Sequence, residues 1–168
     1  QKIIRNYSIN QAREYWRYPK DDGNKPESYL KGKDRSEFLF NLANNVVNQN
    51  KHSHILELGC NVGRNLNEFF INGYHNLTGI EINSNALDIM KNYFPEMSTK
   101  ISLLNYPIES KIMELKDNSY DLVFSMAVLM HVPYESDWIF EHIARICKNL
   151  ITIENETQFA RKNFLRNY

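Results

Sequence analysis

One stretch of the chain, residues 55–65, reads ILELGCNVGRN and decides the fold. Its first four residues predict a short buried strand, yet that strand contains Glu57, and a carboxylate in an apolar strand costs free energy without a partner. Gly59 and Gly63 then leave the backbone open where the strand turns into a helix. Ligands of open parallel sheets bind outside the carboxyl ends of the strands. The stretch therefore predicts the floor of a ligand site.

Working outward, short apolar segments alternate with helical patterns along the chain. The predicted strands are residues 54–59, 76–82, 101–105, 120–126 and 149–155. The predicted helices are residues 34–49, 63–72, 84–94 and 135–148. Near-continuous apolar strands are typical of a parallel sheet that is covered on both faces. We therefore expect an α/β fold with a doubly wound, mostly parallel sheet.

We expect residues 1–50 to form helices and a lid loop. These would pack on an α/β core of residues 51–168, and both parts would form one structural domain. Residues 18–33, rich in Pro, Gly and charge, form the predicted lid. Four aromatic residues of this region could shape a substrate pocket, although such clusters more often serve packing. They are Tyr15, Trp16, Tyr18 and Tyr29.

The composition points to no polyanionic or membrane partner. The chain has 20 Lys+Arg and 20 Asp+Glu, so its net charge favours neither nucleic acid nor an anionic membrane. Its longest apolar run, residues 122–130, is far too short to span a bilayer. Cys60 and Cys147 indicate reduced thiols in a cytoplasmic protein.

The spacing of the glycines discriminates between cofactors. A dinucleotide fingerprint that starts at Gly59 needs glycines at positions 61 and 64, where this chain has Asn61 and Arg64. NAD and FAD are therefore disfavoured. The pattern is instead E-x-G-x-x-x-G, and a carboxylate two residues before the first glycine suits an amino group or a sulfonium better than a pyrophosphate.

Four segments together resemble the class I S-adenosylmethionine-dependent methyltransferases. They are ELGCNVGRN (57–65), GIEIN (79–83), NYPIES (105–110) and YDLVFSMAVLMHVP (120–133). The resemblance covers residues 54–155 and is most similar to small bacterial methylases, including sugar-pathway-associated ones. It implies a Rossmann-like methyltransferase fold with S-adenosylmethionine as cofactor.

The resemblance also implies a set of cofactor-binding residues. Glu81 would bind the ribose hydroxyls, Glu57 would orient nearby amides or the amino group, and either Arg64 or Arg35 would pair with the cofactor's carboxylate. The remaining candidates would hold the methionine part, sandwich the adenine or line the methyl channel. They are Gly59, Cys60, Asn61, Gly63, Ile82, Asn105, Ile108, Ser125 and Met126.

One position departs from the family pattern, and one residue is a candidate for catalysis. Many members have an acid after the third strand that bonds the adenine amino group, whereas this chain has Asn105 there. His131, just after the fourth strand, is a candidate general base, although a structural histidine is the commoner explanation. We expect no metal.

The resemblance ends after the fifth strand. Strands six and seven of the family are absent from this chain, and residues 158–168 would begin a helix or a loop. We expect either a fragment of a longer protein, which we favour, or a shortened member with a covered edge strand. The leading hypothesis is methyl transfer to an O or N atom of a small molecule. The alternatives are a protein or tRNA acceptor, or a cofactor-binding module that has lost catalysis.

Overall fold

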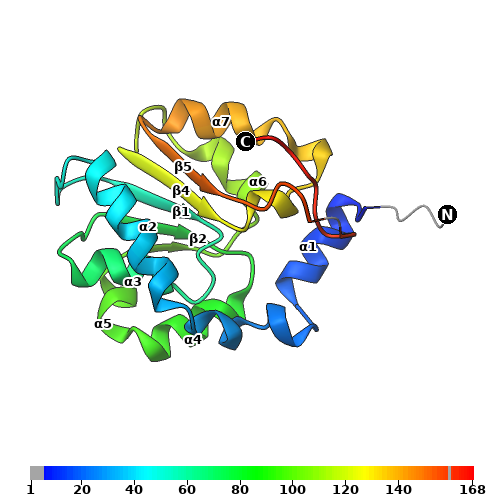
Figure 1. The fold of residues 1–168 in the computed structure, drawn as a ribbon, viewed down its shortest axis with the longest axis horizontal. Coiled ribbons are helices and arrows are strands. Elements are labelled where there is room, and N and C mark those ends of the chain that lie inside the picture. Colours follow the sequence, from blue (N-terminus) through cyan, green and yellow to red (C-terminus); the bar gives the residue numbers. More distant parts are fainter. Residues whose placement is uncertain (1–5, 159) are drawn as a thin grey trace.

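The computed structural model describes residues 6–158 and 160–168, and it shows a parallel sheet between two layers of helices (Figure 1). Its strand order is β3-β2-β1-β4-β5. The strands are β1 (Ile55–Leu58), β2 (Leu77–Ile80), β3 (Ser102–Leu104), β4 (Leu122–Met126) and β5 (Leu150–Ile153). All four neighbouring pairs are parallel. The predicted fold class is confirmed, and each strand lies inside its predicted segment.

The α-helices are α1 (Ile9–Arg17), α2 (Lys33–Val46), α3 (Arg64–Ile71), α4 (Ser84–Tyr93), α5 (Pro95–Lys100), α6 (Ile108–Lys111) and α7 (Ile139–Ile146). Short 3-10 helices cover Asp22–Asn24, Pro26–Leu30, Ile112–Glu114, Leu129–His131 and Tyr134–Ser136. The predicted helix 135–148 begins later than expected because a separate 3-10 turn takes its first residues. The predicted helix 34–49 ends at Val46, before Asn48 and Gln49 turn to positive φ. Within the described ranges, no helix is long and apolar enough to cross a membrane.

Each face of the sheet buries its own apolar core. Strand β1 is central and buried along its whole length, so alternate side chains enter opposite cores. Leu39, Phe69 and Phe124 belong to the core beneath α2 and α3. The other core contains Leu56, Ile112 and Ile143 and lies beneath α6 and α7. This double burial explains why β1 carries almost no polar residue except Glu57.

Helix α1 lies at the carboxyl ends of the strands, apart from the two helical layers (Figure 1). It begins with a capping box between Ser8 and Gln11. Its Trp16 ring packs on His131 with ring centroids 4.3 Å apart. The chain's C-terminal segment also crosses this end, where the amide of Phe164 donates to the carbonyl of Met130 at 2.7 Å. The described residues after β5 form no helix. Of the two structures predicted for residues 158–168, a helix or a loop, the described residues show the loop.

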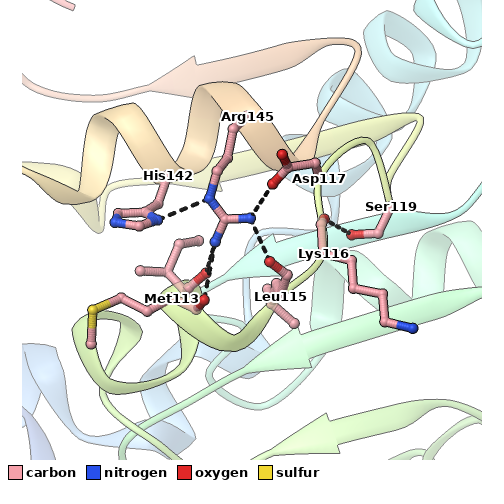
Figure 2. A network of polar contacts seen from close by, with 8 residues as sticks. Met113, Leu115, Lys116, Asp117, Ser119, His142 and Arg145 are labelled. Carbon is pink, nitrogen blue, oxygen red and sulfur yellow. Dashed lines mark hydrogen bonds and ion pairs between the residues drawn. The ribbon is translucent and has the colours of Figure 1, made fainter.

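Arg145 of α7 fixes the connection between α6 and β4 (Figure 2). Its guanidinium donates to the carbonyls of Ile112, Met113 and Leu115 at 3.2, 3.1 and 2.6 Å. It also pairs with Asp117 at 2.6 Å. The segment is irregular, so its carbonyls have no partners in a strand or a long helix. The side chain of Arg145 supplies the hydrogen-bond donors for several of them.

Replacing this residue tests its importance. Arg145→Met should lower the free energy of unfolding by about 2 kcal/mol or more, because several carbonyls lose a charged donor. Lys148→Met is the matched control, since the Lys148 side chain is 62% exposed in its ion pair with Asp121, and such a pair should contribute less than about 1 kcal/mol. Urea denaturation of both variants measures the difference. Equal losses would show that the Arg145 contacts add nothing specific.

Candidate functional site

A cavity of about 580 Å³ lies at the carboxyl ends of β1, β2 and β4, beneath α1 and residues 19–32. This volume is in the range of roughly 300–1,000 Å³ that small-molecule sites occupy. Most of the residues predicted from the sequence line it. They are Arg35, Glu57, Gly59, Cys60, Asn61, Arg64, Glu81, Ile82, Ile108, Met126 and His131.

Three predicted residues do not line this cavity. Gly63 starts α3 with φ of 74°, and a Cβ there would approach Met90 to 2.7 Å. The side-chain amide of Asn105 donates to the backbone carbonyl of Glu81 at 2.8 Å. The hydroxyl of Ser125 donates to Glu154 at 2.6 Å. These residues shape the loops around the cavity and do not face it.

The carboxyl group of Glu57 is almost fully buried. The side-chain amide of Asn65 donates to its Oε1 at 2.7 Å. The other oxygen, Oε2, has no hydrogen-bond partner in the described part of the chain, although the Leu66 amide lies near enough to lower the pKa. Burial outweighs these contacts and raises the pKa of Glu57 to about 8. Without a ligand, this group is mainly protonated at neutral pH.

Glu81, just after β2, is buried beside the same cavity. Its two oxygens accept hydrogen bonds from the backbone amides of Asn61 and Asn83, both at 2.8 Å. Burial raises its pKa, while these two amides act in the opposite direction. Each carboxylate oxygen has two acceptor directions, so one direction per oxygen remains for a ligand. Glu81 therefore both fixes the loop after β1 and can accept further hydrogen bonds.

The loops after β1 and β4 approach each other closely. A Cβ on Gly59, whose φ is 70°, would lie 2.6 Å from Val128. Asn61 and Ala127 have positive φ of 47° and 56°, and Ala127 is a residue type that rarely adopts this conformation. Such strain is typical of ligand sites. The strained backbone thus lies where the two loops meet the cavity.

Arg64 is committed to the lid and to α2. Its Nε donates to the hydroxyl of Ser36 at 2.8 Å, and its Nη1 donates to the carbonyls of Tyr29 and Lys31. Arg35 also lines the cavity; its backbone amide donates to the carbonyl of Gly32 at 3.1 Å, but its guanidinium forms no hydrogen bond or ion pair within the described residues. Of the two predicted carboxylate partners, Arg35 is the one with free donors.

His131 presents a defined tautomer to the cavity. Its Nδ1 lies 2.8 Å from the carbonyl of Lys162, which can only accept, so Nδ1 carries the proton and Nε2 carries the lone pair. Burial lowers the pKa of His131 to about 4. The ring is therefore neutral at physiological pH and acts as a hydrogen-bond acceptor, while it is too weak for a strong general base.

Sequence reasoning missed several residues that build the site. Arg13 and Glu109 line the cavity, and their side chains approach to 3.5 Å. Glu154, at the end of β5, accepts hydrogen bonds from the backbone amides of Leu129 and Met130, both at 3.2 Å. The indication available in the sequence was Glu154 at the end of a predicted strand, the same position relative to its strand as Glu81. No comparable pattern marked Arg13. In residues 6–158 and 160–168 no cluster of His, Cys, Asp or Glu could hold a metal ion.

The raised pKa of Glu57 predicts a pH-dependent stability. Between about pH 4.5 and 8 the folded state holds a proton that the unfolded state releases, so the free energy of unfolding falls as pH rises through this window. Glu57→Gln removes this loss, so its melting temperature relative to the wild type should increase from pH 5 to pH 8 without ligand. Thermal denaturation at several pH values measures this.

Glu96→Gln is the control, because Glu96 is exposed and paired with Lys100. Its melting temperature should follow the wild type between pH 5 and pH 8. If the melting temperatures of Glu57→Gln and the wild type changed equally with pH between pH 5 and pH 8, Glu57 would not be protonated in the folded state.

Comparison with known proteins agrees with this geometry. The profile of the methyltransferase domain family matches residues 56–150. No curated protein matches the chain significantly in sequence.

Several solved structures share the fold. Phosphoethanolamine N-methyltransferase 1 of Haemonchus contortus matches with a TM-score of 0.66 and 13% identity, over 90% of this chain and 34% of its own. A SAM-dependent methyltransferase of Archaeoglobus fulgidus matches with a TM-score of 0.57 and 15% sequence identity. The match covers 73% of this chain and 51% of that protein. TehB of Haemophilus influenzae matches with a TM-score of 0.56 and 20% sequence identity. The match covers 77% of this chain and 44% of TehB. The chain thus spans about half or less of the length of these relatives.

At these identities the structures show a shared fold. The family is shown by the profile, which covers more than half of the 168 residues. The chain belongs to the methyltransferase domain family, within the class I S-adenosylmethionine-dependent methyltransferases.

Proposed function

We propose that this chain binds S-adenosylmethionine in the cavity at the end of the sheet and serves the transfer of its methyl group to an O or N atom of a small molecule. One observation carries the proposal. Two buried carboxyl groups, Glu57 within β1 and Glu81 just after the neighbouring strand β2, line the same cavity. Burial of such groups is costly unless a ligand or the backbone satisfies them.

The residues present fit this cofactor. Oε2 of Glu57 and Oδ1 of Asn61, which have no hydrogen-bond partner among the described residues, are acceptors that suit the cofactor's ammonium group. The spare acceptor directions of Glu81 suit two neighbouring ribose hydroxyls. Ile82 and Ile108 offer apolar surfaces for the adenine. When bound, the cofactor supplies an electrophilic methyl group on its sulfonium.

The same groups disfavour a dinucleotide. A cationic ligand favours the ionised form of the two carboxyl groups near the loop after β1, whereas a pyrophosphate opposes their ionisation and gains no charge partner there. Binding of an ammonium beside Glu57 should therefore lower the pKa of this group and release a proton. This electrostatic preference supports S-adenosylmethionine over NAD at this loop.

The roof of the cavity favours a small acceptor. Trp16 of α1 and Tyr29 of the lid line the cavity together with residues that follow β4. A roofed cavity of this volume admits a small molecule more readily than a folded protein or a tRNA. Methyl transfer needs alignment of the acceptor and exclusion of water, both of which such a roof can provide.

His131 is proposed to orient the acceptor. Its Nε2 lone pair can accept a hydrogen bond from the acceptor's O–H or N–H, so that the nucleophilic atom is positioned toward the methyl group. Its lowered pKa of about 4 keeps the ring neutral, so protonation does not block this acceptor role at physiological pH.

Titration calorimetry tests the cofactor assignment. S-adenosylhomocysteine should bind the wild-type chain, whereas NAD should not. Glu81→Gln should weaken S-adenosylhomocysteine binding by about tenfold or more, because one charge-assisted acceptor is lost. Circular dichroism would check that the variant is folded.

Glu114→Gln serves as control, because this exposed acid is paired with Lys111 and neither residue lines the cavity. Its affinity should equal that of the wild type. Preferred binding of NAD, or unchanged affinity in a folded Glu81→Gln variant, would overturn the assignment.

A further inference from the structure

Helix α1 contributes two unused donors to the cavity wall. The Nε atom of Arg13 and the Nε1 atom of Trp16 are both buried and lack a hydrogen-bond partner in the described part of the chain. Both residues line the cavity, and their spacing of three places them on one face of the helix. Buried donors without a partner are rare in folded proteins, and each costs about 1–3 kcal/mol.

The unused state of Arg13 contrasts with that of other buried or half-buried arginines. Arg64, Arg145 and Arg166 each donate several hydrogen bonds to carbonyl, carboxylate or hydroxyl oxygens. Arg13 forms none within residues 6–158 and 160–168, and its only close charge is Glu109, 3.5 Å from Nη2. The other arginines hold loops in place, whereas the donors of Arg13 are available to a ligand.

These donors also lie outside the set assigned to the cofactor. The cofactor candidates come from strands β1 and β4, from helices α2, α3 and α6 and from the loops after β1, β2 and β3, whereas Arg13 and Trp16 come from α1. The Trp16 ring packs on His131, the residue proposed to orient the acceptor. The α1 wall therefore belongs to the part of the cavity that remains for the acceptor.

We propose that Arg13 and Trp16 bind a carboxylate or phosphate group of the methyl acceptor. The proposal rests on the function proposed above and names its substrate class. A planar guanidinium presents paired donors that match the oxygens of these groups, and an indole N–H can donate to the same group. The acceptor thus carries an anionic oxygen group at one end and the methylated O or N atom at the other.

Glu109 tunes the charge of this subsite. It is buried, accepts a hydrogen bond from Ser136 at 3.2 Å, and offsets the charge of Arg13. A doubly charged phosphate would meet more repulsion from Glu109 than a singly charged carboxylate. We therefore expect the carboxylate to bind more tightly of the two.

The experiment measures the thermal stability of the chain saturated with S-adenosylhomocysteine while acetate or inorganic phosphate is added. Sodium chloride at equal ionic strength corrects for general salt effects. The wild-type melting temperature should rise with acetate, and less with phosphate. A double variant, Arg13→Gln with Glu109→Gln, removes both charges together, so that no unpaired buried charge is left to unfold the protein.

In the double variant the apparent dissociation constant for acetate should rise by about tenfold or more. Arg17→Gln is the control, because Arg17 lies one turn further along α1, is exposed and is outside the cavity wall. It should keep the wild-type response. If phosphate raised the melting temperature more than acetate did, the recognised group of the acceptor would be a phosphate.

Two results would overturn the inference: no stabilisation of the wild type beyond that by chloride, or an equal stabilisation of the double variant. Calorimetry with S-adenosylhomocysteine on the same samples separates this failure from failure of the proposed function. If the cofactor product binds and the anions do not, only the acceptor assignment fails. The anion titration is also performed without S-adenosylhomocysteine, so the anion site is tested even if the cofactor assignment fails.

Discussion

Burial of the Glu57 carboxyl group in the central strand is the constraint on which the other parts of the site depend. Asn65 of α3 donates to Glu57, and its own oxygen accepts from Ser36 of α2 at 2.7 Å. Ser36 in turn accepts from Arg64, which also holds the carbonyl of Tyr29 in the lid. A continuous chain of hydrogen bonds therefore links the floor of the cavity to its roof. Such a network is stable only when each member finds its partner.

The network leaves one oxygen of Glu57 unpaired, and this has an energetic consequence. An unsatisfied buried acceptor lowers stability by about 1–3 kcal/mol. A cationic ligand that pairs with it recovers this free energy and also favours ionisation of the carboxyl group. The strained backbone at Ala127 is a second local cost beside the same cavity. Binding sites are commonly less stable than the rest of a fold, because the groups that bind the ligand are not optimised for stability.

The sequence predicted the strands and the two carboxylates because both depend on local patterns. A buried parallel strand needs a continuous apolar run, and the exceptions Glu57 and Glu81 stand out against it. The five strands and the family are confirmed, and most predicted site residues line one cavity. The roles of these residues remain predictions.

What could not be predicted depends on contacts between distant segments. Whether Ser125 faces the cavity is decided by Glu154, 29 residues away, which takes its hydroxyl. Arg13 enters the cavity wall only because α1 packs across the strand ends, and nothing in its local sequence marks that position. The sequence left open whether Arg64 or Arg35 pairs with the cofactor's carboxylate, and in the fold the carbonyls of Tyr29 and Lys31 in the lid accept hydrogen bonds from Arg64. Side-chain direction at such positions follows from tertiary packing, which periodicity does not reveal.

The most direct test of the central claim is a crystal structure of the chain with S-adenosylhomocysteine. We predict that the ligand's amino group lies within hydrogen-bond distance of Oε2 of Glu57 and that both ribose hydroxyls donate to Glu81. A ligand bound elsewhere, or one bound in the cavity with Oε2 of Glu57 still unpaired, would contradict the claim that this buried carboxylate exists to hold the cofactor.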